Sequence, residues 1–159
     1  GDAFTGYNNV NWWDYETNRP YAWLFNFSTA GISTGVISMQ VSMMNQDQSY
    51  YAPRFWKAEW SFTPDMSAAA DSKWHLIKEF SVPDLSTWSN TLYSSSVGFK
   101  QMNFALPLEI LGKDNVYIRI CPVNDLCSDG GDYANAHLNE KESGTHSSSL
   151  EYFAIRYNK

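Results

Sequence analysis

The segment "PRFWKAEWSFTP" (Pro53–Pro64) begins and ends at a proline and alternates between two kinds of side chain. Trp56 and Trp60 lie on one side of the alternation, and Lys57 and Glu59 lie on the other. Successive side chains of a β-strand point to opposite faces of the sheet. The segment is therefore predicted to be a strand with both tryptophans facing a core, because large aromatic side chains on an apolar strand face usually pack there. Phe62 shares this strand face, and Trp23 and Trp74 are predicted to face the core for the same reason.

The same alternation recurs along the chain, whereas helix signals are weak. It predicts about seven or eight strands, over residues 21–28, 35–43, 54–62, 74–82, 98–106, 115–120 and 150–157. The best helix signal, Asp65–Ser72, is too short for more than a turn of helix. The sequence thus predicts an all-β fold, a two-sheet antiparallel β-sandwich or jelly roll. We expect residues 1–20 to pack on a single sandwich domain formed by residues 21–159.

Composition narrows the range of partners. The 159 residues are 43% hydrophobic, 16% aromatic and 18% charged, with a formal net charge of −6. A negative chain without a cluster of Lys and Arg repels phosphate backbones, which argues against nucleic acid and anionic membranes. No apolar run approaches the ~20 residues that span a bilayer. Uncharged polar or cationic ligands fit this composition better.

Strand direction predicts where a ligand binds. If consecutive strands are antiparallel, residues 1–20 and the connections near 44–53, 83–97 and 124–148 meet at one end of the sandwich. Long loops on a rigid scaffold are where binding sites are usually built. The predicted ligand-binding residues at this end are Trp12, Trp13, Tyr50, Tyr51, Arg54, Trp88, Asn135 and His137.

These side chains combine flat aromatic rings with amides, a guanidinium and an imidazole. Sugar-binding sites combine such groups, because the C–H face of the sugar ring stacks on an aromatic ring while each hydroxyl needs a hydrogen-bond donor or acceptor. Trp12 and Trp13 are adjacent, so in an extended segment one faces inward and the other outward. Alternation does not say which of the two is exposed.

The motif "PRFWKAEWSFTPDMS", followed by "KWHLIKEF", resembles a pattern of galactose-binding-like (discoidin-type) jelly rolls. These domains are attached to secreted polysaccharide-processing and surface proteins of bacteria. The resemblance implies a secreted or cell-surface module, tethered to other domains, that binds carbohydrate or is structural. It also implies that a structural calcium is possible. The chain departs from the pattern where a longer "FTPDMSAAADS" replaces the usual Asp-Gly turn.

Two short motifs in the last third of the chain each allow two interpretations. Asp125, Asp129 and Asp132 in "DLCSDGGDY" suit a hard cation such as calcium, although an acidic Gly-rich turn without metal has the same composition. Cys121 and Cys127 either close a small disulfide loop or remain two thiols.

No catalytic motif is present in the sequence. It contains no nucleophile elbow, zinc-protease motif, phosphate-binding loop or dinucleotide fingerprint. We therefore expect no enzyme and no catalytic residue. The leading hypothesis is a carbohydrate-binding module for an oligosaccharide or polysaccharide. The alternative is a structural or protein-binding adhesion module, and a small glycan-active hydrolase or lyase ranks third.

Overall fold

The computed structural model describes residues 7–9, 12–45, 53–81, 98–126, 137–138 and 148–158. Its strands are β1 (Tyr7–Asn9), β2 (Trp13–Asp14), β3 (Arg19–Pro20), β4 (Trp23–Phe27), β5 (Val36–Asn45), β6 (Phe55–Ser61), β7 (His75–Ser81), β8 (Gly98–Ala105), β9 (Val116–Pro122) and β10 (Ser148–Asn158). Two short 3₁₀ helices accompany them, η1 (Ala68–Lys73) and η3 (Leu108–Ile110). Among these elements, no helix has the length and apolarity needed to cross a membrane.

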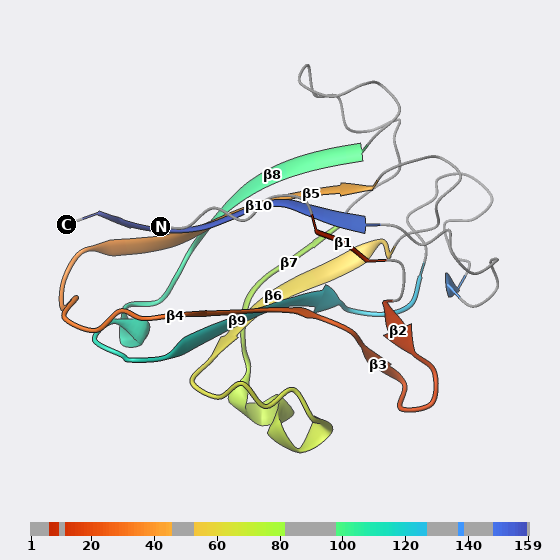
Figure 1. Ribbon diagram of the computed structural model, residues 1–159, viewed down its shortest axis with the longest axis horizontal. Coiled ribbons are helices and arrows are strands. Elements are labelled where there is room, and N and C mark those ends of the chain that lie inside the picture. The colour runs from red at the N-terminus through yellow and green to blue at the C-terminus, as the bar shows by residue number, and fades with distance from the viewer. Residues whose placement is uncertain are drawn as a thin grey trace.

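Eight of the described strands form two four-stranded antiparallel sheets, which lie one above the other in Figure 1. Strands β2 and β3 pair with each other as a separate antiparallel hairpin. One sheet has the order β1-β10-β5-β8, and the other has the order β4-β9-β6-β7. The pairs β1 with β10, β4 with β9, β5 with β8 and β6 with β7 are nested along the chain. A long hairpin wrapped into two sheets has this connectivity, which is that of a jelly roll. The predicted all-β antiparallel sandwich is confirmed.

The predicted strands all occur, with ends that differ by a few residues. Strand β6 ends at Ser61, so Phe62 lies beyond it and is exposed rather than in the core. The short helical turn expected over Asp65–Ser72 is present as η1. Because side-chain alternation depends only on the strand backbone, it located these elements without knowledge of their partners.

Three tryptophans form the centre of the core. Trp23 and Trp56 lie parallel, with ring centroids 5.7 Å apart, and Trp12 meets both edge-on at 4.4 and 4.8 Å. The buried indole nitrogen of Trp56 donates to the carbonyl of Pro53 at 2.9 Å. Edge-to-face aromatic contacts of this kind add to the free energy gained by burying the rings. The core positions predicted for Trp23, Trp56 and Trp60 are confirmed.

Trp74 is buried as expected, but in a different place. The guanidinium carbon of Arg119 lies 4.5 Å from the centroid of the Trp74 ring. The side chain of Arg119 points away from the sandwich core. Its indole nitrogen donates to the carbonyl of Asp65 at 2.8 Å. Trp74 therefore holds the segment 62–74 against the outer face of the β4-β9-β6-β7 sheet.

One glycine is required by a close approach of two chain segments. Gly35, which precedes β5, has a φ of 108°, and a Cβ there would lie 2.9 Å from the ring of Tyr157 and closer still to the carbonyl oxygen of Asn158. Gly31 also has a positive φ, of 79°, but a Cβ there would meet nothing within 4 Å.

We expect Gly35→Ala to lower the free energy of unfolding by about 2–4 kcal/mol, because backbone strain and a steric clash act together. Gly31→Ala is the matched control and should cost only about 1 kcal/mol of backbone strain. Urea unfolding of both variants measures the difference. Equal losses would show that the contact with β10 imposes no constraint.

Candidate functional site

The end of the sandwich where the sequence predicts a ligand site is built as expected from the strand directions. Strands β5, β7 and β9 finish at this end, and β6, β8 and β10 begin there, on the right in Figure 1. The β2–β3 hairpin lies at the same end.

A polar cluster joins three chain segments at this end. The hydroxyl of Tyr15 donates to one carboxylate oxygen of Asp125 at 2.9 Å, and Nδ1 of His137 lies 2.8 Å from the other. Backbone pairing supports the cluster, since the amide of Leu138 donates to the carbonyl of Asp125 at 2.8 Å. The structure thus brings together parts of residues 1–20 and of the connection 124–148, which strand counting placed at the same end.

The other predicted ligand-binding residues lie in different environments. Trp12 is only 1% exposed and packs in the core, so the prediction that it contacts a ligand is wrong. Trp13 is half-buried at the start of the hairpin, which settles the choice that alternation left open. The guanidinium of Arg54 lies over the ring of Phe55, 5.5 Å from its centroid.

Several predicted residues lie outside the described residues. They are Tyr50, Tyr51, Trp88, Asn135, Asp129 and Asp132. Asp125 accepts hydrogen bonds from protein groups, and the described part of the chain holds no group of three or more His, Cys, Asp or Glu suited to a metal ion. Calcium binding in "DLCSDGGDY" therefore stays a prediction.

The two adjacent tryptophans should respond differently to substitution. We expect Trp12→Ala to lower the free energy of unfolding by about 3–5 kcal/mol, because it removes the ring that contacts both Trp23 and Trp56. Trp13→Ala should cost only about 1 kcal/mol. Chemical denaturation followed by circular dichroism tests this, and a larger loss for Trp13→Ala would contradict the inward orientation of Trp12.

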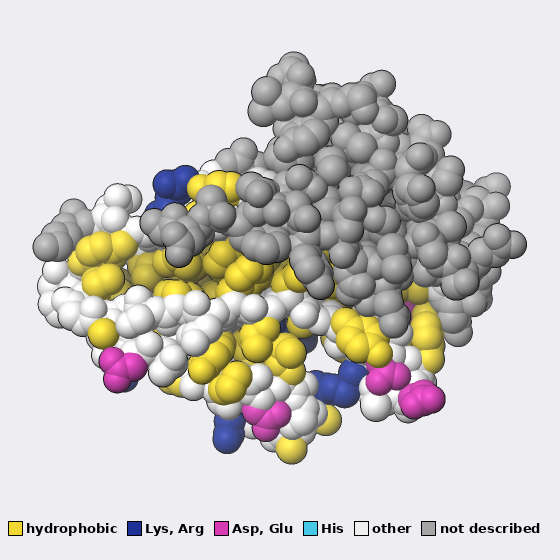
Figure 2. Space-filling model, in the orientation of Figure 1, with side chains coloured by type: hydrophobic (Ala, Val, Ile, Leu, Met, Phe, Trp, Pro, Cys, Tyr) yellow, Lys and Arg dark blue, Asp and Glu magenta, His cyan; other side chains and the backbone are white. Residues whose placement is uncertain are grey.

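A second candidate site lies on the outer face of the β4-β9-β6-β7 sheet, between the hairpin and the segment 62–74. It is a hollow of about 320 Å³. Figure 2 shows basic side chains, in dark blue, at the gap between the hairpin and the segment at the bottom of the view. The lining residues are Trp13, Asn18, Arg19, Pro20, Tyr21, Ala22, Lys57, Met66, Asp71, Arg119, Cys121 and Val123.

Local hydrogen bonds shape the hairpin side of the hollow. Asp14 accepts from the amide of Glu16 at 2.9 Å and from the hydroxyl of Thr17 at 2.8 Å, which closes the turn. Asn18 adopts a φ of 55° and accepts a hydrogen bond from the indole nitrogen of Trp13 at 3.3 Å. Asn and Asp tolerate such turns better than most residues because their short side chains bond to nearby groups.

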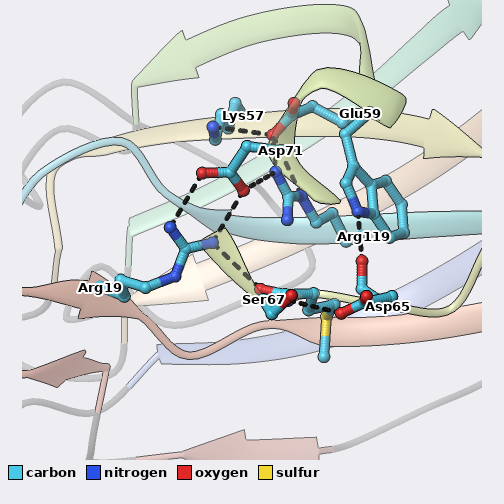
Figure 3. Close-up of polar contacts among 9 residues, drawn as sticks. Arg19, Lys57, Glu59, Asp65, Ser67, Asp71 and Arg119 are labelled. Carbon is cyan, nitrogen blue, oxygen red and sulfur yellow. Dashed lines mark hydrogen bonds and ion pairs between the residues drawn. The ribbon is translucent and has the colours of Figure 1, made fainter. Parts of the chain in front are cut away.

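Lys57 and Arg119 line the floor of the hollow, and a buried carboxylate behind them pairs with both (Figure 3). Glu59 and Arg119 are 7% and 6% exposed and face each other on neighbouring strands, with Nη2 of Arg119 at 3.1 Å from the carboxylate. Nζ of Lys57 lies 2.8 Å from the same carboxylate oxygen. A buried carboxylate needs such partners, since removal of a charge from water is costly.

An ion pair closes the hollow on the other side. Arg19 of β3 donates from both terminal nitrogens to the two carboxylate oxygens of Asp71 in η1, at 2.8 and 2.7 Å (Figure 3). Arg19 also donates to the carbonyl of Met66 at 3.0 Å. The bidentate bond with Asp71 raises the pKa of Arg19, and the same bond lowers the pKa of the Asp71 carboxyl below 3.8. We call this pair the Arg19–Asp71 clasp.

Cys121 lies at the floor of the hollow as a free thiol. Burial raises its pKa to about 11. The thiol is therefore protonated near neutral pH and is a poor nucleophile. The second cysteine, Cys127, for which the sequence left a disulfide and a free thiol both open, lies outside the described residues.

Side-chain alternation does not predict this hollow, because counting strands places the connection over residues 63–73 at the opposite end of the sandwich. Instead the segment folds back across the sheet through Trp74 and Asp71. One signal was available, because Lys57 and Glu59 take outward positions on a strand whose inward face is rich in tryptophan. Their partner Arg119 takes the outward position of another apolar strand, but their pairing depends on strand order, which alternation does not give.

The Arg19–Asp71 clasp should make the free energy of unfolding depend on pH. Since the folded-state pKa of Asp71 is depressed, its contribution is complete above about pH 4 and is lost as the pH falls through the folded value. Asp71 is half-exposed, so solvent screening keeps the contribution near about 0.5–1 kcal/mol.

We expect Asp71→Asn to lower the free energy of unfolding by this amount at pH 7 and by much less at pH 2.5. Urea unfolding across this range is the measurement. Asp114→Asn, at an exposed residue that makes none of the ion pairs described above, is the control for the loss of one carboxylate and should lower the free energy of unfolding at pH 7 by less than Asp71→Asn. A loss for Asp71→Asn that does not change with pH would contradict the clasp.

Comparisons with known proteins find only distant structural similarity. No protein family matches the chain, and no curated protein does. Two solved cleaved adhesin domains of Lys-gingipain from Porphyromonas gingivalis are similar at TM-scores of 0.47 and 0.49, with 13% and 15% identity over 87% and 93% of this chain. A further cleaved adhesin domain of Lys-gingipain gives 0.42, with 9% identity over 86%.

This chain covers 63%, 71% and 62% of those three chains, so it spans less than two thirds of two of them. Similarity at this level assigns the chain to no family. The resemblance to galactose-binding-like domains, beyond the sandwich itself, stays a prediction.

Proposed function

We propose that this domain is a non-catalytic adhesion module of a larger secreted or surface protein, and that it binds a saccharide in the outer-face hollow. The observation that carries the proposal is the lining of the hollow. The rings of Trp13 and Tyr21 stand beside the amide of Asn18 and the charged groups of Lys57 and Asp71. Aromatic faces next to fixed donors and acceptors suit the two chemically different sides of a sugar ring.

Size and rigidity support the same assignment. A volume of about 320 Å³ is at the lower end of the range for small-ligand sites. The floor consists of side chains from β6 and β9, the two central strands of their sheet. A site on central strands loses little conformational freedom when a ligand binds, so the entropic cost of binding there is low.

The carboxylates support a binding role over hydrolysis. Glycoside hydrolysis uses two carboxyl groups across a cleft. Within the described residues, Asp71 is the one carboxylate that lines the hollow, and Arg19 engages both of its oxygens.

A panel of oligosaccharides and polysaccharides, followed by titration of tryptophan fluorescence, tests the proposal. We expect Trp13→Ala and Tyr21→Ala each to weaken saturable binding by about five- to thirtyfold, since stacking on each ring contributes roughly 1–2 kcal/mol. Phe62→Ala is the matched control, because it removes an exposed ring outside the hollow.

The unfolding midpoints of all three variants should be compared with that of the wild type. Binding that survives both substitutions would place the saccharide site elsewhere, and no binding across the panel would contradict the proposal.

Protein adhesion is the second candidate, and exposed apolar side chains at the opposite end of the sandwich favour it. Val36 and Leu108 are 64% and 63% exposed, and a hydrogen bond from the amide of Leu106 to the carbonyl of Ile37 joins their segments. Binding to purified extracellular proteins that Val36→Ser or Leu108→Ser removes, and Trp13→Ala does not, would favour this candidate.

A further inference from the structure

The hollow has a local charge opposite to that of the whole chain. Among the described residues, three cations, Arg19, Lys57 and Arg119, line it against one carboxylate, Asp71, whereas the chain carries a formal net charge of −6. A second carboxylate, Glu59, does not line the hollow but pairs with two of the lining cations, Lys57 and Arg119. Even with Glu59 included, the ion-paired group keeps one positive charge in excess.

The excess charge is held in place. Arg119 is 6% exposed and is fixed by Glu59 on one side and the ring of Trp74 on the other. Lys57 is only partly exposed. Glu79 stands opposite Lys57 in the register of β6 and β7, but it does not line the hollow. Partly buried charges are weakly screened, so a ligand anion in the hollow would interact with them more strongly than at an open surface.

The shape of the donors favours a planar anion. Guanidinium groups match a carboxylate through parallel hydrogen bonds, as the Arg19–Asp71 clasp shows within the protein itself. Trp13 and Tyr21 add apolar ring surface on the same hollow. A ligand that satisfies both features carries a carboxylate on a sugar ring.

We propose that the hollow recognises an acidic saccharide, namely a hexuronate unit. Its carboxylate balances the excess positive charge of Lys57, Arg19 and Arg119, and its ring contacts Trp13 and Tyr21. This inference rests on the proposed function and names its ligand class. It also revises the expectation, drawn from the net charge, that uncharged or cationic ligands fit best.

Calorimetric titration with three probes tests the inference. They are a galacturonic acid disaccharide, its neutral galactose counterpart, and N-acetyl-diglycine, a peptide with a free carboxylate. We expect the acidic disaccharide to bind at least about tenfold more tightly than the other two at low salt, as one charge-assisted hydrogen bond would give. The preference should fall as the salt concentration rises.

Variants of Lys57 separate the effect of its charge on binding from any effect on the fold. Lys57→Met keeps most of the apolar stem and should abolish the preference for the acidic disaccharide, whereas Lys57→Arg should retain most of it. Lys78→Met is the control, since Lys78 is an exposed lysine of β7 that does not line the hollow. Thermal unfolding of each variant shows whether the fold is intact.

The outcomes are distinguishable. Equal affinity for the acidic and neutral disaccharides, with binding lost in Trp13→Ala, would overturn this inference and leave the proposed function standing. Equal affinity for the acidic disaccharide and the peptide would show that the hollow recognises a carboxylate without the sugar ring, which would also overturn this inference. If no saccharide binds in the hollow, the inference and the proposed function both fail.

Discussion

The outer face of this sandwich depends on the buried ion pair between Glu59 and Arg119. Strand β6 is covered on both sides, by tryptophans of the core on one and by the segment 62–74 on the other. A carboxylate at such a position is costly unless it is paired, because water no longer solvates it. Lys57 and Arg119 provide the partners, and Trp74 covers the guanidinium. The charged layer and the segment that covers it therefore require each other.

The clasp between Arg19 and Asp71 extends this layer to the N-terminal hairpin. Asp71 also lies 3.6 Å from Arg119, so charges of the hairpin, η1 and the two central strands form one network. Exposed ion pairs contribute little to stability one at a time, but a bidentate pair within a network has better-defined geometry. The network thus matters less for the free energy of unfolding than for the position of the hollow's walls.

Alternation of side chains in the sequence was enough to predict the strands, the sandwich and the core positions of Trp23, Trp56 and Trp60. It also placed the hairpin, Asp125 and His137 at one end, because antiparallel order follows from counting strands. It could not choose between Trp12 and Trp13, since adjacent residues differ only in which face they take. It could not find the hollow either, because Lys57, Glu59 and Arg119 meet through strand order, and the segment 62–74 folds back through contacts distant in sequence.

The hairpin connects the two candidate sites. Tyr15, at its turn, reaches Asp125 and hence His137 at the end of the sandwich, while Trp13 and Arg19, on its two strands, line the hollow. Its base is joined to the core, because the amide of Tyr21 donates to the carbonyl of the buried Trp12. A hairpin held at its base by the core, at its turn by Asp125 and at its side by Asp71 has little freedom to move. The hollow is consequently pre-formed, and ligand selection there depends on the fixed charges and rings of its lining rather than on closure around the ligand.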